Sequence, residues 1–240
     1  MKGIIYISEA NSPVNMFPKL KPNGEIRLLV DLIPRNKITI KDNSRISNQQ
    51  MILRAVARAK YWSTIDLSNW YFQIRVASED EQFNTIKTPF RSFACKVMLQ
   101  GDCNAPPTVM QGIENVLDRL IGLCIWAYMD YITIFLDTFE EHIQHVRQVC
   151  QQLQNHKICA SPTKCKFFAD KLPLLGHVID YNSIYTDPEK IRDIQDWLTL
   201  KSKKEVQKFI SIVIYNAQFL PHLSTILVLL SDLTSQDEFE

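Results

Sequence analysis

The sequence lacks any apolar run long enough to cross a membrane as a helix. Such a helix needs about 18 or more consecutive apolar residues, whereas the longest candidate, residues 226–230, is far shorter. The N-terminal end also lacks a secretory signal, because Ser8 and Glu9 interrupt the brief apolar stretch found there. These absences argue against a membrane-spanning protein and against a secreted one.

The six cysteines show no Cys-x-x-Cys spacing, and we interpret them as reduced intracellular thiols rather than as a disulfide framework. We therefore expect an intracellular protein, cytoplasmic or nuclear, with no membrane partner. One group, His142, His145, Cys150, His156 and Cys159, resembles a set of zinc ligands. Most of it falls on one predicted amphipathic helix, so the preferred interpretation is surface histidines with a buried Cys150 thiol.

The chain has almost no net charge, since 27 Lys and Arg oppose 26 Asp and Glu. The charges are unevenly spread, however: residues 1–60 hold eleven basic and four acidic residues, and the middle of the chain is rich in acids. Basic flanks around an acidic centre suit a protein that grips phosphates and holds metal ions between them. Exposed charge that is merely uneven explains the pattern equally well. The first interpretation predicts basic walls of a cleft from residues 1–60 and 201–208.

No internal repeat and no low-complexity linker is present. Hydrophobic periodicity predicts strands and helices that interleave without a regular β-α-β order, which favours the α+β class. Thr138 and Ser202, each followed three residues later by Glu, predict capping boxes. The expected strands are 26–30, 61–66, 72–76, 124–128, 132–136 and 172–179, and the expected helices are 48–59, 108–120, 139–155, one from 186–188 and one after Ser202.

Two carboxylates stand out because each ends or interrupts an apolar strand. Asp66 ends the strand 61–66, and Asp130 lies in the tight turn of an apolar hairpin. A carboxylate beside an apolar core is costly unless it is paired or binds a cation, and paired carboxylates suit Mg²⁺. Aspartate is also a common turn residue, so Asp130 taken alone fits a structural role as well.

The hairpin sequence 128–132, Tyr-Met-Asp-Tyr-Ile, resembles the Tyr-x-Asp-Asp hairpin of reverse transcriptases. It is accompanied by further blocks that resemble the same family, in the family's order. These are 27–41, 63–74, 97–106, 175–179 and 186–191. The chain is thus identified as similar to the reverse transcriptase of gypsy-type LTR retrotransposon polyproteins, and it resembles the basidiomycete-type branch.

The resemblance implies a right-hand polymerase, with fingers, a palm whose antiparallel sheet carries helices on one face, and the start of a thumb or connection. It implies fingers at 1–60, palm at 61–175 with a fingers insertion near 77–105, and a primer-grip hairpin with thumb or connection helices at 176–240. The implied activity is RNA-directed DNA polymerisation with Mg²⁺ or Mn²⁺. The implied partners are an RNA or DNA template with its primer, and deoxynucleoside triphosphates.

Roles carry over to individual residues by position. Asp66 and Asp130 are the implied metal ligands and catalytic carboxylates. The implied nucleotide-binding residues are Arg27, Lys21, Tyr71 and Gln100, of which Tyr71 would lie under the sugar of the nucleotide. Gly176 and His177 are the implied primer grip.

Two positions depart from the family pattern. Tyr131 stands where the family has the second aspartate of the hairpin, which predicts impaired catalysis. Trp70 stands where a small residue usually precedes the sugar-contacting aromatic, which predicts a crowded nucleotide pocket. A catalytically dead nucleic-acid-binding remnant is therefore the alternative function, and an unrelated α+β protein with structural aspartates is a third.

Overall fold

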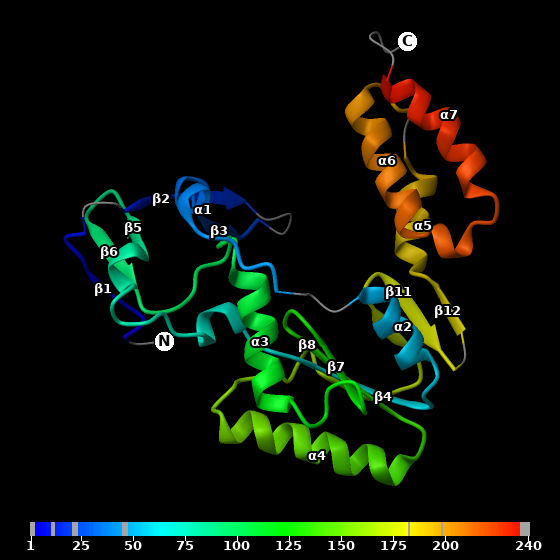
Figure 1. Cartoon of the computed structure of the whole chain (residues 1–240), viewed down its shortest axis with the longest axis horizontal. Helices are drawn as coiled ribbons and strands as arrows, with labels where there is room; N and C mark the ends of the chain where they lie inside the picture. The colour runs from blue at the N-terminus through cyan, green and yellow to red at the C-terminus, as the bar shows by residue number, and fades with distance from the viewer. Residues whose placement is uncertain are drawn as a thin grey trace. The chain divides into compact units, whose positions relative to one another are not determined.

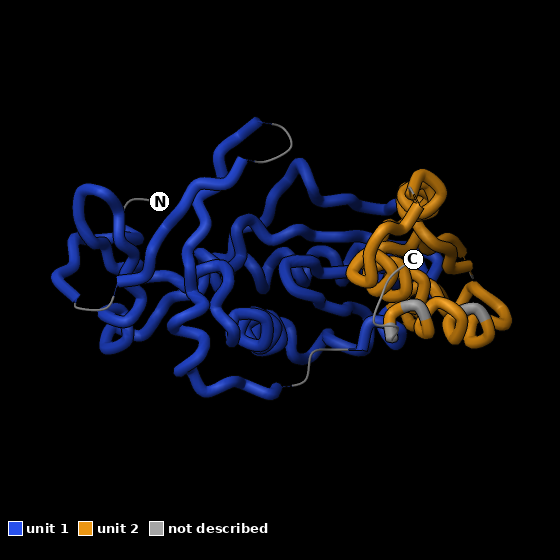
Figure 2. Tube along the Cα trace, turned by 90° about the horizontal axis from the view of Figure 1, so that it is seen from above, with its two compact units in different colours: residues 1–52, 59–169 blue, residues 53–58, 170–240 orange. Residues whose placement is uncertain are grey.

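The computed structural model describes residues 3–10, 13–20, 24–44, 48–181, 183–197 and 199–235 (Figure 1). Two compact units are distinguished: residues 1–52 with 59–169, and residues 53–58 with 170–240 (Figure 2). Strands and helices interleave in the first unit without a regular β-α-β order, and in the second unit three strands are followed by helices, so the predicted α+β class is confirmed. Across the described residues, no helix is both long and apolar enough to span a membrane.

An antiparallel sheet with the strand order β7-β8-β4-β9 belongs to the first unit. Its strands are rich in β-branched and aromatic residues, which fit a pleated, half-buried surface. The predicted hairpin is present as β7 and β8, and β4 pairs with β8 from Tyr61↔Leu136 to Asp66↔Tyr131. The bounds are Tyr61–Asp66 for β4, Ile125–Tyr128 for β7, Tyr131–Leu136 for β8 and Lys166–Ala169 for β9.

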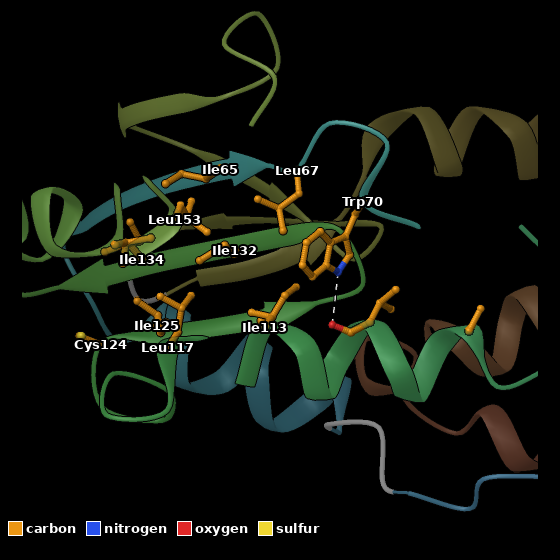
Figure 3. Packing of buried hydrophobic residues seen from close by; sticks show 14 of the residues in the cluster. Ile65, Leu67, Trp70, Ile113, Leu117, Cys124, Ile125, Ile132, Ile134 and Leu153 are labelled. Carbon is orange, nitrogen blue, oxygen red and sulfur yellow. Dashed lines mark hydrogen bonds between the residues drawn. The ribbon is translucent and has the colours of Figure 1, made fainter. Parts of the chain in front are cut away.

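Two helices, α3 (Ala105–Leu117) and α4 (Phe139–Asn155), pack against one face of this sheet. Isoleucines of β4, β7 and β8 form a buried cluster with side chains of both helices (Figure 3). Each such fully buried side chain stabilises the fold by about 2 kcal/mol. Successive strand residues point to opposite faces. Because Ile65 faces the helices, Asp66 and its cross-strand partner Tyr131 lie on the opposite face.

The segment after β4 is not the strand that was predicted for residues 72–76. The chain turns at Asn69, whose φ of 46° is left-handed, and continues as the 3₁₀ helix η1 (Trp70–Gln73). The Phe72 N–H donates to the Asn69 carbonyl at 2.8 Å. The prediction was wrong because alternation over five residues fits a short, half-buried helix as well as a strand.

Helix α3 begins at Ala105, three residues before its predicted start at Thr108. Pro106 and Pro107 lie in the first turn, where backbone N–H groups have no partner within the helix and proline therefore costs no hydrogen bond. The predicted start at Thr108 was too late for this reason.

Trp70 packs against α3 at a glycine. Its side chain is 5% exposed, and its indole Nε1 donates to the Val109 carbonyl at 3.3 Å (Figure 3). A Cβ atom placed on Gly112 would lie 3.3 Å from Cζ2 of the indole. Glycine at this helical position therefore leaves the space that the tryptophan ring fills.

A second sheet of the first unit has the order β1-β6-β5-β2-β3, with β2 and β5 parallel and the other neighbours antiparallel. Together with α1 (Ile33–Ile38), it surrounds a small core made by Leu32, Ile86, Cys95 and Leu99. Segments from 5–30 and 85–95 thus share one sheet. The fingers and palm boundaries stay predictions. The bounds are Ile5–Ile7 for β1, Val14–Leu20 for β2, Ile26–Val30 for β3, Thr85–Lys87 for β5 and Ser92–Cys95 for β6; η2 (Glu81–Phe83) precedes β5.

The second unit contains a three-stranded antiparallel sheet, β10-β11-β12, followed by helices. Asp187 caps α5, which begins with Pro188, and Ser202 Oγ accepts from the Glu205 N–H at 3.3 Å at the start of α6. Both predicted helix starts are confirmed. The bounds are Leu172–Leu174 for β10, His177–Asp180 for β11, Ser183–Thr186 for β12, Pro188–Gln195 for α5, Lys203–Tyr215 for α6, Ala217–Phe219 for η3 and Leu223–Ser235 for α7; α2 (Gln49–Ala57) spans the boundary between the units.

In helix α4, the interpretation of His142 as a surface residue and of Cys150 as a buried thiol is wrong. His142 is fully buried, with Nε2 2.7 Å from Ser63 Oγ, whereas Cys150 is exposed. The aromatic rings of Tyr61 and Phe168 lie 6.3 and 5.1 Å from the His142 ring. The prediction was wrong because Ser63 gives an inward imidazole a hydrogen-bond partner, which the periodicity of α4 alone does not reveal.

The predicted capping box at Thr138 is also absent in its expected form. Thr138 Oγ1 donates to the Glu141 carboxylate at 2.6 Å instead of accepting from the backbone. The helix still begins where the sequence predicts, because Phe139 packs its ring 5.6 Å from that of Tyr61.

Candidate active site

Asp66 and Asp130 come together at one end of the β7-β8-β4-β9 sheet. Asp66 is the last residue of β4, and Asp130 lies in the turn between β7 and β8. The backbone joins them, because the Leu67 N–H donates to the Asp130 carbonyl at 2.8 Å. Met129 makes the turn with a left-handed φ of 56°. The role of the two aspartates as metal ligands stays a prediction.

The Asp66 carboxylate is 2% exposed, and two neighbouring side chains stabilise its negative charge. Lys164 Nζ lies 3.5 Å from Asp66 Oδ2, and its own side chain is 64% exposed. Tyr131 is the cross-strand partner of Asp66 and shares a hydrogen bond with its carboxylate. A buried carboxylate needs such partners, since an unpaired charge at this depth costs several kcal/mol.

Burial and neighbouring charges raise the pKa values of Asp130 and Tyr131. Burial raises the pKa of Asp130 above its ordinary value, and the nearby charge of Asp66 raises it further, while Lys164 lowers it. Burial, the charge of Asp66 and the hydrogen bond to Asp66 raise the pKa of Tyr131. Tyr131 is therefore a neutral phenol at neutral pH, which donates a hydrogen bond but adds no negative charge.

The donor set fits a hard divalent cation. Two carboxylates on adjoining backbone segments can share such a cation, which prefers carboxylate, water and phosphate oxygens. In the part of the chain that the structure describes, no group of three or more His, Cys, Asp or Glu side chains is arranged to hold a metal. Asp66 and Asp130 would therefore carry any bound cation between them.

A cavity of about 480 Å³ opens beside Asp130. Its lining includes Arg27, Tyr71, Gln100 and the start of α3 at Ala105, so it gathers most of the predicted nucleotide-binding residues. Arg27 donates to Gln100 Oε1 at 2.6 Å, which holds the guanidinium at the cavity. Burial and the charge of Asp130 raise the pKa of the Tyr71 phenol.

Trp70, which was predicted to crowd this pocket, does not line it, and Lys21 lies outside the described residues. Trp70 is buried against Gly112 and is not among the residues that line the cavity. The prediction of a crowded pocket was wrong, because the 3₁₀ turn directs Trp70 into the core while Tyr71 lines the cavity.

The predicted primer grip lies in the second unit and is described by itself. Gly176 has a φ of 68°, and a Cβ there would lie 3.4 Å from the ring of Tyr215. His177 is 2% exposed, with its ring 5.1 Å from that of Tyr215 and 5.5 Å from that of Phe219. Any contact that this hairpin makes with a primer would therefore not come from the imidazole.

The sequence reasoning missed Lys164 and the residue that fixes the segment before it. Gln73 Nε2 donates to the Ser68 and Cys159 carbonyls at 2.6 and 2.9 Å, and its Oε1 accepts from the Cys159 N–H at 2.7 Å. The Ser161 N–H donates to the Asp66 carbonyl at 2.8 Å. No local sequence signal marks either residue. Lys164 follows Asp130 by thirty-four positions in a loop with no motif of its own.

Solved structures share this fold along the whole chain. The complex of the foamy viral protease-reverse transcriptase with double-stranded DNA matches with a TM-score of 0.91 and 23% identity, over 99% of this chain and 42% of that one. The complex of the same enzyme with an RNA/DNA hybrid matches with a TM-score of 0.88 and 23% identity, over 99% of this chain and 32% of that one. The fold is therefore that of a right-hand polymerase.

The sequence narrows this class. Residues 19–179 match the family model described as "Reverse transcriptase (RNA-dependent DNA polymerase)", and the chain belongs to the reverse transcriptase family.

Relatives with similar sequences are retrotransposon polyproteins. The retrovirus-related Pol polyprotein from transposon opus of Drosophila melanogaster is 29% identical over 97% of this chain and 24% of its own length. The transposon Tf2-3 polyprotein of Schizosaccharomyces pombe is 28% identical over 98% of this chain and 18% of its own length. The chain thus spans about a quarter or less of the length of these relatives.

Proposed function

We propose that this chain is the polymerase portion of a gypsy-type LTR retrotransposon reverse transcriptase, and that Tyr131 lowers its catalytic rate. It would extend a DNA primer on an RNA or DNA template with deoxynucleoside triphosphates, using Mg²⁺ or Mn²⁺. Its intracellular location remains part of this proposal. One observation carries the proposal: the Asp66–Asp130 pair adjoins a cavity that Arg27, Tyr71 and Gln100 line.

Each residue of this group has a chemical task in the proposal. Asp66 and Asp130 would hold the cation, which when bound stabilises charge on the attacking and leaving oxygens of phosphoryl transfer. Arg27, held by Gln100, would donate to the triphosphate oxygens as a planar, permanently charged group. The ring of Tyr71 would lie under the sugar and exclude a 2′-hydroxyl.

Primer extension tests the proposal directly. Wild type and Tyr131→Asp would be incubated with an RNA template, a DNA primer, deoxynucleoside triphosphates and Mg²⁺ or Mn²⁺. We expect extension by the Tyr131→Asp protein, and none once Asp66→Asn is added to it. Template-independent addition, or extension that survives Asp66→Asn, would reject the proposal.

The second candidate is a nucleic-acid-binding remnant without catalysis. The ion pair of Lys164 with Asp66 favours it, because the carboxylate already has a counter-charge. In that case the Tyr131→Asp protein binds a primer–template duplex but never extends it.

A further inference from the structure

Lys164 lies beside Asp66, where the proposed function would have a divalent cation bind. Its Nζ lies 3.5 Å from Asp66 Oδ2, and the Asp66 side chain is 2% exposed. The lysine side chain is 64% exposed, so its ammonium reaches the carboxylate from the solvent side. The pair therefore combines a buried anion with a cation that can leave.

The backbone around Lys164 is fixed to the strand that carries Asp66. The Ser161 N–H donates to the Asp66 carbonyl at 2.8 Å, and the Lys164 N–H donates to the Ser161 carbonyl at 3.0 Å. Leu67 forms a β-bridge with Ala160. The side-chain amide of Gln73 donates to the Cys159 carbonyl and accepts from the Cys159 N–H. The fold thus holds the backbone of the Lys164 segment against the strand that carries Asp66.

Tyr131 makes the balance of charge unusual. A carboxylate at this position would leave three negative charges around one ammonium, whereas the neutral phenol leaves two. A single ammonium offsets a larger share of two charges than of three, and it competes more strongly with an incoming divalent cation.

We propose that Lys164 is the resident counter-ion of Asp66 and competes with the divalent cation for this carboxylate. A cation that binds Asp66 and Asp130 must displace the ammonium, which then moves into solvent. The inference rests on the proposed function only in taking these two aspartates as the cation's ligands.

Manganese binding gives the first test, because the electron paramagnetic resonance signal of free aqueous Mn²⁺ falls as the ion binds protein. Titrations of the full chain would compare wild type with Lys164→Gln, Lys164→Arg and Asp66→Asn. We expect Lys164→Gln to bind Mn²⁺ roughly two- to fivefold more tightly, the range that loss of one partly exposed ion pair allows. Lys164→Arg keeps the charge and should stay near wild type.

The same titrations can overturn the inference. Unchanged or weaker Mn²⁺ binding in Lys164→Gln rejects the competition, and unchanged binding in Asp66→Asn rejects Asp66 as the carboxylate concerned. Circular dichroism and the unfolding midpoint of each variant show that it is folded. Because the readout is metal binding, absence of primer extension by the Tyr131→Asp protein would reject the proposed function and leave this result standing.

Reactivity of the lysine itself gives a second test in unaltered protein. The rate at which an amine-acylating reagent modifies Lys164 would be followed by mass spectrometry with and without Mn²⁺. Lys171 is the matched control, because it is 62% exposed and pairs with Asp180 at 3.3 Å. We expect Mn²⁺ to accelerate acylation of Lys164 severalfold and to leave Lys171 unchanged. Equal rates at Lys164 with and without Mn²⁺ would reject the proposal.

Discussion

In the proposed function, Tyr131 is the residue that lowers the catalytic rate. It lies across the strand pair from Asp66, is 45% exposed and stays neutral beside two carboxylates. Loss of one preorganised electrostatic contact typically costs about a hundredfold in rate. We therefore expect Tyr131→Asp to raise the rate of primer extension by roughly a hundredfold over wild type.

The matched control for this prediction is Tyr131→Phe. It removes the hydroxyl that bonds to Asp66 but adds no carboxylate, so its rate should stay near that of wild type. If wild type extends a primer as fast as Tyr131→Asp, then Asp66 and Asp130 suffice without a third carboxylate, and the prediction is wrong.

Trp70 and Gly112 allow a prediction about stability. A valine at Gly112 would press into an indole that is buried and hydrogen-bonded, and overpacking of this kind costs about 1–3 kcal/mol. We expect Gly112→Val to lower the free energy of unfolding by about 2 kcal/mol in urea denaturation. Asn115→Val, on the exposed part of the same helix, has the same β-branched cost and should change little. Equal losses in the two variants would refute the packing argument.

At the scale of single residues, the sequence predicted the aspartates better than their surroundings. Asp66 and Asp130 are found where a strand end and a hairpin turn put them, because local pattern determines both features. Trp70 was misplaced, since its direction depends on a 3₁₀ turn that begins with a left-handed Asn69. Lys164 and Gln73 were missed because their partners lie about ninety positions away in the chain, and no local pattern encodes such contacts.

At the scale of elements, α4 is attached to β4 through a buried histidine. Burial, assisted by the charge of nearby His145, lowers the pKa of His142 to about 4. The folded state therefore favours the neutral imidazole, whereas the unfolded state takes up a proton below about pH 6.5. This contribution to stability is complete above pH 6.5 and is lost as the pH falls toward 4, by up to about 3 kcal/mol.

The expected outcome is a steeper fall in stability from pH 7 to pH 4.5 for wild type than for His142→Gln. Urea unfolding at several pH values would measure the difference, which separates His142 from the carboxylates that titrate in the same range. His156 is exposed at the end of the same helix, so His156→Gln should keep the slope of wild type. Parallel curves for wild type and His142→Gln would contradict the assignment.

The contact between η1 and the segment 159–161 gives a prediction about local motion. Gln73 makes two hydrogen bonds across it, both with Cys159, one as donor and one as acceptor. We expect Gln73→Ala to speed amide hydrogen exchange at Cys159 and Ser161 by tenfold or more, since each lost bond weakens protection by about 1 kcal/mol. Gln82, which bonds only to the nearby Glu79 carbonyl, is the control. Unchanged exchange in Gln73→Ala would show that Gln73 does not hold the segment.

At the scale of the whole molecule, the sequence predicted the class of fold because strand and helix periodicities are local and strong. The sheet that joins 5–30 with 85–95 could not be derived in the same way. Its strands are short, and their pairing spans up to ninety residues, so tertiary packing and not local pattern selects the partners. The resemblance to a known family supplied the connection between these segments, because it implies that residues near 77–105 are an insertion that belongs to the fingers.

The uneven charge of the whole chain predicts how it binds nucleic acid. Basic residues in 1–60 would neutralise phosphates and release counterions, which makes the logarithm of affinity fall linearly with the logarithm of salt concentration. Fluorescence anisotropy of a primer–template duplex would measure this slope. The salt concentration would be varied between roughly 50 and 300 mM, on either side of physiological ionic strength. Affinity that does not change with salt, or no binding at low salt, would refute the interpretation of the charge pattern.

The contact of Trp70 with Gly112 also couples the two positions to each other. A glycine at 112 opposite a small residue at 70 leaves a cavity, which destabilises by a few kcal/mol. A residue larger than glycine at 112 brings its Cβ atom within 3.3 Å of the tryptophan ring, which must then shift. Each residue therefore fits best in the presence of the other, and a change at one position is tolerated more readily when the other changes with it.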